Sequence, residues 1–233
     1  MKNLDEIRKK LFELAEPGYR DFTKNLIPNL DESLIIGVRV PLTRKLAINI
    51  SKENPGLAEE YLNVLPHKYY EENNLHGFLI ELIDDVDLAI RKTDEFLPYV
   101  DNWSTCDIFS PKIFKKHKGI IYDKALEWVN SGDTYVVRYG IGMLMTHFLD
   151  EEFKPEAIEI VSKIRSEEYY INMMIAWYFA TALAKNYDET ISYLNRRVLM
   201  PWTHNKAIQK AIESRRVPIR LKGELRKLKI KNR

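Results

Sequence analysis

Apolar residues recur at three- and four-residue spacing through nearly the whole chain. In the segment 134–149, for example, Val137, Ile141, Leu144 and Phe148 fall on one face of a helix. Alternating patterns typical of strands are short or absent. The pattern therefore predicts an all-α protein. The predicted helices cover residues 3–14, 19–28, 31–51, 55–63, 68–83, 86–99, 102–110, 113–129, 134–149, 154–165, 168–185, 187–199 and 203–213.

Several of these helices should end at glycine or proline, because neither residue continues a helix well. Such breaks occur at Glu-Pro-Gly (16–18), Glu-Asn-Pro-Gly (53–56), Ser-Gly-Asp (131–133) and Lys-Pro (154–155). No linker rich in Pro, Gly or Ser divides the chain. We therefore predict a single domain over residues 1–233, with a basic C-terminal arm at about 214–233.

Part of the sequence repeats. Laid over 169–199, the segment 134–165 matches Tyr135 with Tyr170 and Arg138 with Met173 at an offset of 35 residues. Helix-pair repeats of this length stack into a curved solenoid whose inner helices line one surface. The uneven repeat length suits HEAT-like units. We therefore predict a right-handed α-solenoid of HEAT-like helical repeats with a concave groove.

Composition excludes several classes of protein. With 233 residues and 45% hydrophobic content the chain can bury a substantial core, so disorder is not expected. No apolar run is long enough to cross a bilayer, and the first residues lack the apolar centre of a signal peptide. We expect a cytoplasmic protein without a membrane partner. The single cysteine, Cys106, excludes an intrachain disulfide and a Cys-rich zinc site.

Charge is distributed unevenly along the chain. The net charge is +2, but residues 206–233 hold eleven Lys or Arg against Glu213 and Glu224, a local charge of +9. The remainder therefore carries −7. A basic arm of this kind suits a polyanionic partner, because neutralising phosphates releases counterions. The alternative is a solvated tail that aids solubility.

Four residues stand out as candidates for a site, because helical repeats that stack would bring all four to one groove. Trp103 and Asp107 lie four apart and should share a helix face. Arg138 lies near the start of a later helix, where it could reach a phosphate, or it could tie neighbouring repeats together. Trp177 lies in a nearly all-apolar helix, whose composition favours a core position over a ligand-facing one. For Trp103 and Asp107 the alternatives are a core role and a surface or capping role.

Together these four residues resemble the AlkD-like DNA glycosylases, a HEAT-repeat family of bacterial DNA alkylation-repair enzymes. The resemblance rests on the spacing Trp-x3-Asp, then an Arg about thirty residues on, then a Trp after Ala, thirty-nine residues later. It extends back to Gly-Val-Arg-Val-Pro-Leu-Thr-Arg-Lys-Leu-Ala at 37–47. The resemblance implies removal of N3- and N7-alkylated purines from double-stranded DNA, without base flipping, without a cofactor and without lyase activity.

The resemblance also implies a role for each residue. Asp107 would stabilise the cation that develops on the deoxyribose, while Trp103 and Trp177 would hold the sugar and backbone through their ring faces. Arg138 would bind a nearby phosphate. The alkylated purine is already cationic, so it leaves without a general acid. We expect the protein to act as a monomer.

The chain departs from the family at two positions. Cations expected four residues before and three after the second Trp are replaced by Met173 and Ala180. We hypothesise that basic residues near the C-terminus supply the missing phosphate contacts, since the last repeat of a solenoid can border the same groove. These residues are Lys206, Lys210, Arg215 and Arg216.

Other chemistry is weakly indicated. The five histidines show no HExxH motif, no close pairing in the sequence and no Cys partner, so we expect no metal site. Cys106 is interpreted as a small buried thiol, not a nucleophile. A basic run at 112–118 could follow a DNA strand or form a solvated helix face. No Gly-rich phosphate loop is present.

Three functions therefore compete. The first is a DNA glycosylase for cationic alkylpurines, in which Asp107 is central. The second is a DNA-binding protein on the same scaffold that lacks excision activity, which the uncharged Met173 and Ala180 favour. The third is a HEAT-repeat module that binds a polypeptide on its concave surface.

Overall fold

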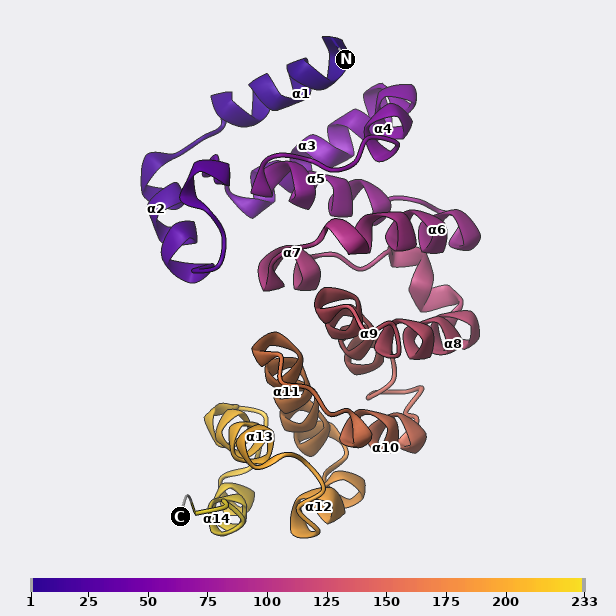
Figure 1. Cartoon of the computed structure of the whole chain (residues 1–233). Coiled ribbons are helices and arrows are strands. Elements are labelled where there is room, and N and C mark those ends of the chain that lie inside the picture. Colours follow the sequence, from indigo (N-terminus) through magenta and orange to yellow (C-terminus); the bar gives the residue numbers. More distant parts are fainter. Residues whose placement is uncertain (1, 232–233) are drawn as a thin grey trace. The chain divides into compact units, whose positions relative to one another are not determined.

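Helices form almost all of the regular structure in the computed structural model, which describes residues 2–231 (Figure 1). Fourteen α-helices and three short 3₁₀ turns occur within these residues, and no strand does. The all-α prediction is therefore confirmed. The chain divides into two compact units, an N-terminal unit (Met1–His117) and a C-terminal unit (Lys118–Arg233).

The N-terminal unit is built around α5, a helix whose residues are all buried. Helix α3 packs on α5, α5 packs on α7, and α1, α4 and α6 also contact α5. Its helices are α1 (Lys2–Glu13), α2 (Pro17–Leu26), α3 (Val40–Glu53), α4 (Pro55–Leu62), α5 (Tyr70–Ile80), α6 (Val86–Phe96) and α7 (Trp103–Ile108). Its 3₁₀ turns are Glu32–Leu34, Leu97–Tyr99 and Lys112–Lys116.

The C-terminal unit repeats the same packing. Helix α8 packs on α9, α9 on α11 and α11 on α13, while α10 and α12 contact both α11 and each other. Its helices are α8 (Lys118–Val129), α9 (Thr134–His147), α10 (Pro155–Lys163), α11 (Tyr169–Lys185), α12 (Tyr187–Asn195), α13 (Pro201–Glu213) and α14 (Ile219–Lys227). Packing between alternate helices in both units is compatible with a solenoid of helical repeats.

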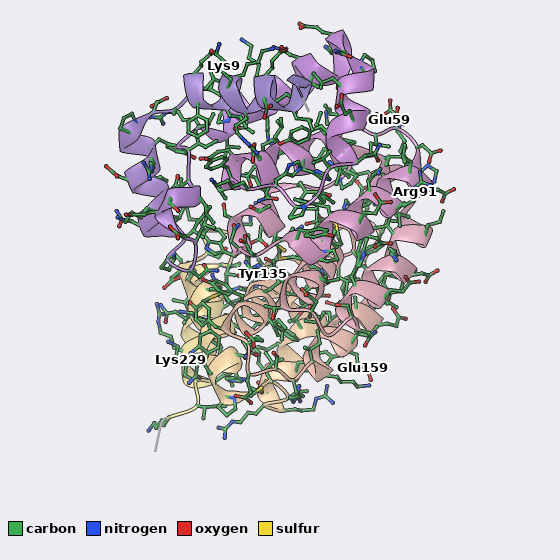
Figure 2. The ribbon with its side chains drawn as sticks, turned by 45° about the horizontal axis from the view of Figure 1, so that its top comes forward. Lys9, Glu59, Arg91, Tyr135, Glu159 and Lys229 are labelled. Carbon is green, nitrogen blue, oxygen red and sulfur yellow. The ribbon has the colours of Figure 1, made fainter. Side chains whose placement is uncertain are left out.

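The predicted repeat register is visible within the C-terminal unit. Tyr135 and Tyr170, which the 35-residue offset matches, are each the second residue of their helix, and their ring centroids lie 5.8 Å apart. At Gly140 the backbones of α8 and α9 approach so closely that an added Cβ would lie 2.8 Å from the Val129 nitrogen. Apolar side chains fill each unit, while charged residues such as Glu59 and Glu159 are exposed (Figure 2).

The predicted helix at 31–51 is wrong over its first nine residues. A 3₁₀ turn occupies Glu32–Leu34, and the chain then runs without regular structure until α3 begins at Val40. A buried carboxylate, Glu71 of α5, accepts hydrogen bonds from the backbone nitrogens of Ile36, Gly37 and Val38. These hydrogen bonds to Glu71 take the place of helical hydrogen bonds in this segment. Gly37 also adopts a φ of 98°, a backbone conformation that favours glycine.

Two other segments differ in kind from prediction. The predicted helix at 113–129 is a 3₁₀ turn (Lys112–Lys116) followed by α8, which begins at Lys118. The predicted C-terminal arm is not an open tail: it contains the unpredicted helix α14 and packs on α13. Residues 232 and 233, at the end of the predicted arm, lie outside the described residues.

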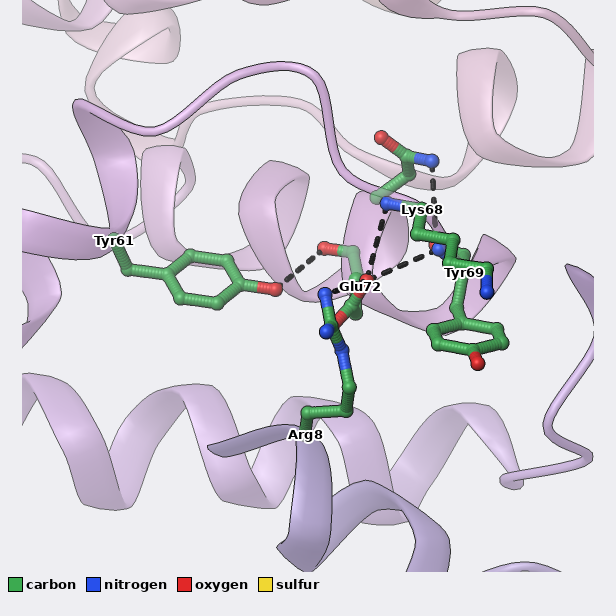
Figure 3. Close-up of polar contacts among 6 residues, drawn as sticks. Arg8, Tyr61, Lys68, Tyr69 and Glu72 are labelled. Carbon is green, nitrogen blue, oxygen red and sulfur yellow. Dashed lines mark hydrogen bonds and ion pairs between the residues drawn. The ribbon is translucent and has the colours of Figure 1, made fainter. Parts of the chain in front are cut away.

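Glu72 joins α1 to the start of α5 (Figure 3). Its Oε1 accepts a hydrogen bond from Arg8 Nε at 2.6 Å, and its Oε2 accepts hydrogen bonds from the backbone nitrogens of Lys68 and Tyr69. The Tyr61 hydroxyl donates to the Glu72 carbonyl at 3.1 Å. The carboxylate therefore both caps a helix and forms an ion pair, which fixes the N-terminal helix on the central one.

Two histidines that are nine residues apart in sequence are paired beside this cluster. His67 Nε2 and His76 Nδ1 lie 2.8 Å apart, and the rings stack on Tyr61 and Phe96 respectively. Burial lowers the pKa of His67 to about 4, despite the nearby Glu72. Burial, with the neighbouring charges of His67 and Lys92, lowers the pKa of His76 well below its ordinary value.

This pair predicts a loss of stability in acid. An unfolded histidine takes up a proton near pH 6.5, whereas folded His67 resists protonation until about pH 4. The unfolded state therefore binds more protons, and stability falls as the pH falls through this window. For His67 alone we expect a loss of about 3 kcal/mol between pH 7 and pH 4, measured by urea unfolding.

A matched variant separates this effect from acid titration elsewhere. His67→Gln keeps a group that can hydrogen-bond to His76 but cannot titrate. Its unfolding free energy should depend less steeply on pH than that of the wild-type protein. Equal pH dependence of the two proteins would show that His67 does not contribute.

Candidate functional site

Trp103 and Asp107 both lie on α7, a helix of six residues in the N-terminal unit. Asn102 caps the helix, its side chain accepting a hydrogen bond from the Thr105 nitrogen at 2.8 Å. Trp103 and Asp107 are half-buried, one helical turn apart, so both reach the surface on one side of the helix. Cys106, between them, is buried, which agrees with its interpretation as a structural thiol.

Helix α7 is fixed on α5 by hydrogen bonds from its first turn. The hydroxyls of Tyr70 and Ser104 lie 2.7 Å apart. Thr105 donates from Oγ1 to the Asn74 side chain at 2.9 Å, and Asn102 donates to the same Thr105 hydroxyl at 3.0 Å. Because Thr105, Asn74 and Asn102 are buried, this network holds the start of the helix in one position.

Arg44 of α3 holds the other end of α7. Its Nη2 donates to the Ile108 carbonyl at 2.7 Å, and its guanidinium pairs with Glu81, which follows α5. Glu81 in turn accepts a hydrogen bond from the Ser110 nitrogen at 2.9 Å. The guanidinium carbon also lies 4.0 Å from the centre of the Phe78 ring. The backbone that follows Asp107 is therefore held at Ile108 by Arg44 and at Ser110 by Glu81.

Sequence reasoning did not single out this arrangement. Arg44 lies within the stretch 37–47 that carries the family resemblance, but the resemblance marks the stretch as a whole and not this arginine. Nothing in the sequence pairs it with Glu81, which is 37 residues away. The available signal was the resemblance of this stretch itself.

Arg138, on α9 in the C-terminal unit, is buried, with 3% of its surface exposed. Its Nη1 donates to the Tyr170 carbonyl at 2.7 Å, near the start of α11. The arginine thus ties two successive repeats together, as one of its two interpretations expected, although the acceptor is a backbone carbonyl and not a carboxylate. A guanidinium has five N–H donors, of which this bond uses one.

Trp177, on α11, is 41% exposed. The core position that composition favoured is therefore wrong. The indole lines a cleft of about 420 Å³ between α11 and α13, together with Thr181, Lys210, Glu213 and Arg216. Lys210 Nζ lies 5.9 Å from the centre of the Trp177 ring. The C-terminal unit thus brings an exposed aromatic ring and two of the predicted cations to one cleft.

Lys210 lies in a basic environment. Burial lowers the pKa of its ammonium group, and the charges of Lys206 and Arg138 lower it too, while Glu213 opposes them. The positive charges of Lys210 and Arg138 therefore repel each other within this unit, although Arg138 lies on α9 and Lys210 lies on α13. A concentration of positive charge of this kind is suited to an anionic ligand.

The remaining predicted residues differ in position. Lys206 Nζ lies 5.8 Å from the ring centre of Trp202, one turn earlier on α13. Arg215 is exposed and is not among the residues that line the cleft. Ala180, where the family resemblance leads one to expect a cation, lines the cleft with its small side chain, while Met173 is half-buried.

The predicted site residues thus fall into two groups, one in each unit. Trp103 and Asp107 belong to the N-terminal unit, and Arg138, Trp177 and the C-terminal cations belong to the other. The convergence of the two groups on one groove stays a prediction.

None of the helices in residues 2–231 is long and apolar enough to cross a membrane. Within the same residues, His, Cys, Asp and Glu form no group of three or more that could hold a metal ion.

Comparison with known proteins identifies the family. No curated protein matches the chain. A family model described as "DNA alkylation repair enzyme" matches residues 7–211. The matched range includes Trp103, Asp107, Arg138 and Trp177 and ends before α14. Because the model covers most of the sequence, the chain belongs to the DNA alkylation repair enzyme family, which supports a role in DNA repair.

Proposed function

We propose that this protein is a DNA glycosylase that hydrolyses the N-glycosidic bond of cationic N3- and N7-alkylated purines in duplex DNA, without base flipping and without lyase activity. The observation that carries the proposal is the position of Asp107: a half-buried carboxylate beside Trp103, on a short helix held at both ends, in a member of a DNA alkylation repair family.

The chemistry requires few groups. When the bond between C1′ and the purine nitrogen breaks, the bonding electrons go to the purine, which leaves neutral because alkylation had made it cationic. Positive charge grows on the deoxyribose, and a nearby carboxylate stabilises it. Water then adds to C1′ and releases a proton to solvent or to Asp107. The face of Trp103 favours the same developing cation.

The C-terminal unit supplies the DNA contacts in this proposal. Trp177, Lys210 and Arg216 line one cleft, so a sugar could lie on the indole while a phosphate binds the cations. Lys210 and Arg216 take the place of the cations that Met173 and Ala180 lack. Arg138 adds charge near Lys210 while also tying the repeats together.

The direct test is to incubate the protein with duplex DNA that contains 7-methylguanine and to measure free base by chromatography. We expect release of 7-methylguanine, and an intact DNA strand until alkali is added. A second candidate, a DNA-binding protein without excision activity, is favoured by the uncharged Met173 and Ala180. It predicts salt-sensitive duplex binding with no base release at any pH.

The position of the cleft predicts different effects for two neighbouring arginines. The logarithm of the binding constant falls linearly with the logarithm of the salt concentration. For Arg216→Ala this slope should be less steep than for the wild-type protein by about 1, because one phosphate contact is lost. Arg215→Ala is the matched control, since Arg215 is exposed and lies outside the cleft. Titrations by fluorescence anisotropy at several salt concentrations give both slopes. Equal slopes for the two variants would contradict the assignment.

A further inference from the structure

We propose that Tyr169 and Trp202, with Lys206, form a stacking site for an unpaired nucleotide of DNA. The inference rests on the proposed function only in taking DNA as the partner. It adds a second DNA-binding element, separate from the cleft around Trp177, and it assigns that element to DNA in which a base has lost its partner.

Both rings are exposed at the start of their helices. Tyr169 is the first residue of α11 and is 53% exposed, while Trp202 is the second residue of α13 and is 46% exposed. Their centroids lie 5.6 Å apart with the ring planes at 60°. Tyr170 contacts Tyr169 at 5.2 Å, and Tyr135 follows at 5.8 Å from Tyr170. These four residues, which we name the aromatic edge, run along the N-terminal ends of α9, α11 and α13.

The helices that present the two rings are fixed to one another. Thr203, beside Trp202, donates from Oγ1 to the Asn172 side chain at 3.1 Å, and Asn172 donates to the Ser166 carbonyl at 2.7 Å. Thr203 and Asn172 are both buried. The rings therefore keep their spacing, and little conformational entropy is lost when a planar ligand binds them.

The positive charge near Trp202 indicates the chemistry of the ligand. Lys206 Nζ lies 5.8 Å from the centre of the Trp202 ring, and the sequence from Lys206 to the C-terminus carries +9. Exposed aromatic rings beside cations suit a base with its phosphate, because every base has a face that stacks and a neighbouring negative charge. Glu167 and Glu168 precede Tyr169, so we place the phosphate beside Lys206 and not beside Tyr169.

The ligand should be unpaired. In an intact duplex each base has both faces covered by its neighbours, so a protein ring cannot stack on it without separating them. An unpaired base in a bulge or a single strand exposes a face at less cost. The aromatic edge therefore favours DNA of this kind over intact duplex.

The test compares the binding of Trp202→Ala to two fluorescein-labelled DNAs: a paired duplex and the same duplex with one bulged thymidine. We expect binding to the bulged DNA to weaken about tenfold, within the range for loss of one stacked base, and binding to the paired duplex to change less than twofold. Trp202→Phe should retain most of the preference. Tyr99→Ala removes an exposed aromatic of the N-terminal unit and serves as the matched control.

Tryptophan fluorescence gives an independent measurement. Oligothymidine should quench the wild-type protein more than Trp202→Phe if a base stacks on Trp202. Equal quenching, or bulge binding by Trp202→Ala that matches the wild type, would overturn the inference. An equal loss on both DNAs would also overturn it, because it would indicate a general backbone contact.

The outcome is distinguishable from the fate of the proposed function. Release of 7-methylguanine from paired DNA tests the glycosylase, whereas the bulge preference tests the aromatic edge. If no base is released but the preference depends on Trp202, the glycosylase proposal fails and the stacking site stands. If base is released and Trp202→Ala binds both DNAs normally, the reverse holds.

Discussion

Asp107→Asn is expected to slow the release of 7-methylguanine from duplex DNA by about 100-fold or more, in the range measured when an enzyme loses one group that stabilises transition-state charge. The amide is nearly isosteric with the carboxylate but carries no charge, so it cannot stabilise the cation that grows on the sugar. Single-turnover kinetics with enzyme in excess measure this step directly, because binding and product release then do not limit the rate.

The fold should survive this substitution. Asp107 is half-buried and lies on a helix whose ends are held by other residues, among them Asn102 and Arg44. Circular dichroism and the unfolding midpoint should match those of the wild type, and affinity for undamaged duplex should not fall. Asp84→Asn removes an exposed carboxylate of the same unit and should keep full activity. Full activity in Asp107→Asn would refute the glycosylase mechanism.

Glu71→Ala should produce the largest loss of stability, about 3 to 5 kcal/mol. Glu71 is fully buried, and its carboxylate accepts hydrogen bonds from the Ile36, Gly37 and Val38 nitrogens at 2.8, 2.7 and 3.2 Å. Alanine leaves three backbone donors buried without this acceptor. Urea unfolding monitored by circular dichroism gives the change in free energy.

Two variants make this result interpretable. Glu71→Gln keeps one acceptor oxygen, so we expect its loss of stability to lie between those of the wild type and Glu71→Ala. Glu59→Ala, which removes an exposed carboxylate of the same unit, should change stability by less than about 0.5 kcal/mol. A loss below about 1 kcal/mol for Glu71→Ala would show that water or a rearranged backbone replaces the carboxylate.

Local periodicity was sufficient to predict most helices, because their apolar faces are encoded within each segment. It failed where a residue that is distant in the sequence determines the backbone conformation. The stretch 35–39 looks compatible with helix, yet it is held by a carboxylate more than thirty residues later in the chain. Helix α14 was missed for a different reason. Its sequence is dominated by cations, and only Leu225 of the helix is buried, so little amphipathic pattern marks it.

The candidate site shows the same limit. The four-residue spacing of Trp103 and Asp107 correctly predicted that they share one short helix. For Trp177, the composition of α11 predicted burial, but the helices that pack on α11 leave this indole at the edge of a cleft. Exposure of a single residue in an apolar helix depends on which face its neighbour covers, and spacing within the helix does not contain that information.

The way α14 returns to α13 bears on the entropy of DNA binding. His204 Nε2 lies 3.0 Å from the Leu228 carbonyl, Asn205 exchanges two hydrogen bonds with Ile230, and Lys229 donates to Gln209. The connection at 214–218 is therefore closed at both ends. A free basic tail would have to lose its chain entropy each time it met a phosphate. Here folding has already restricted the chain, so Arg216, which we propose as a phosphate contact, lies in a preorganised loop.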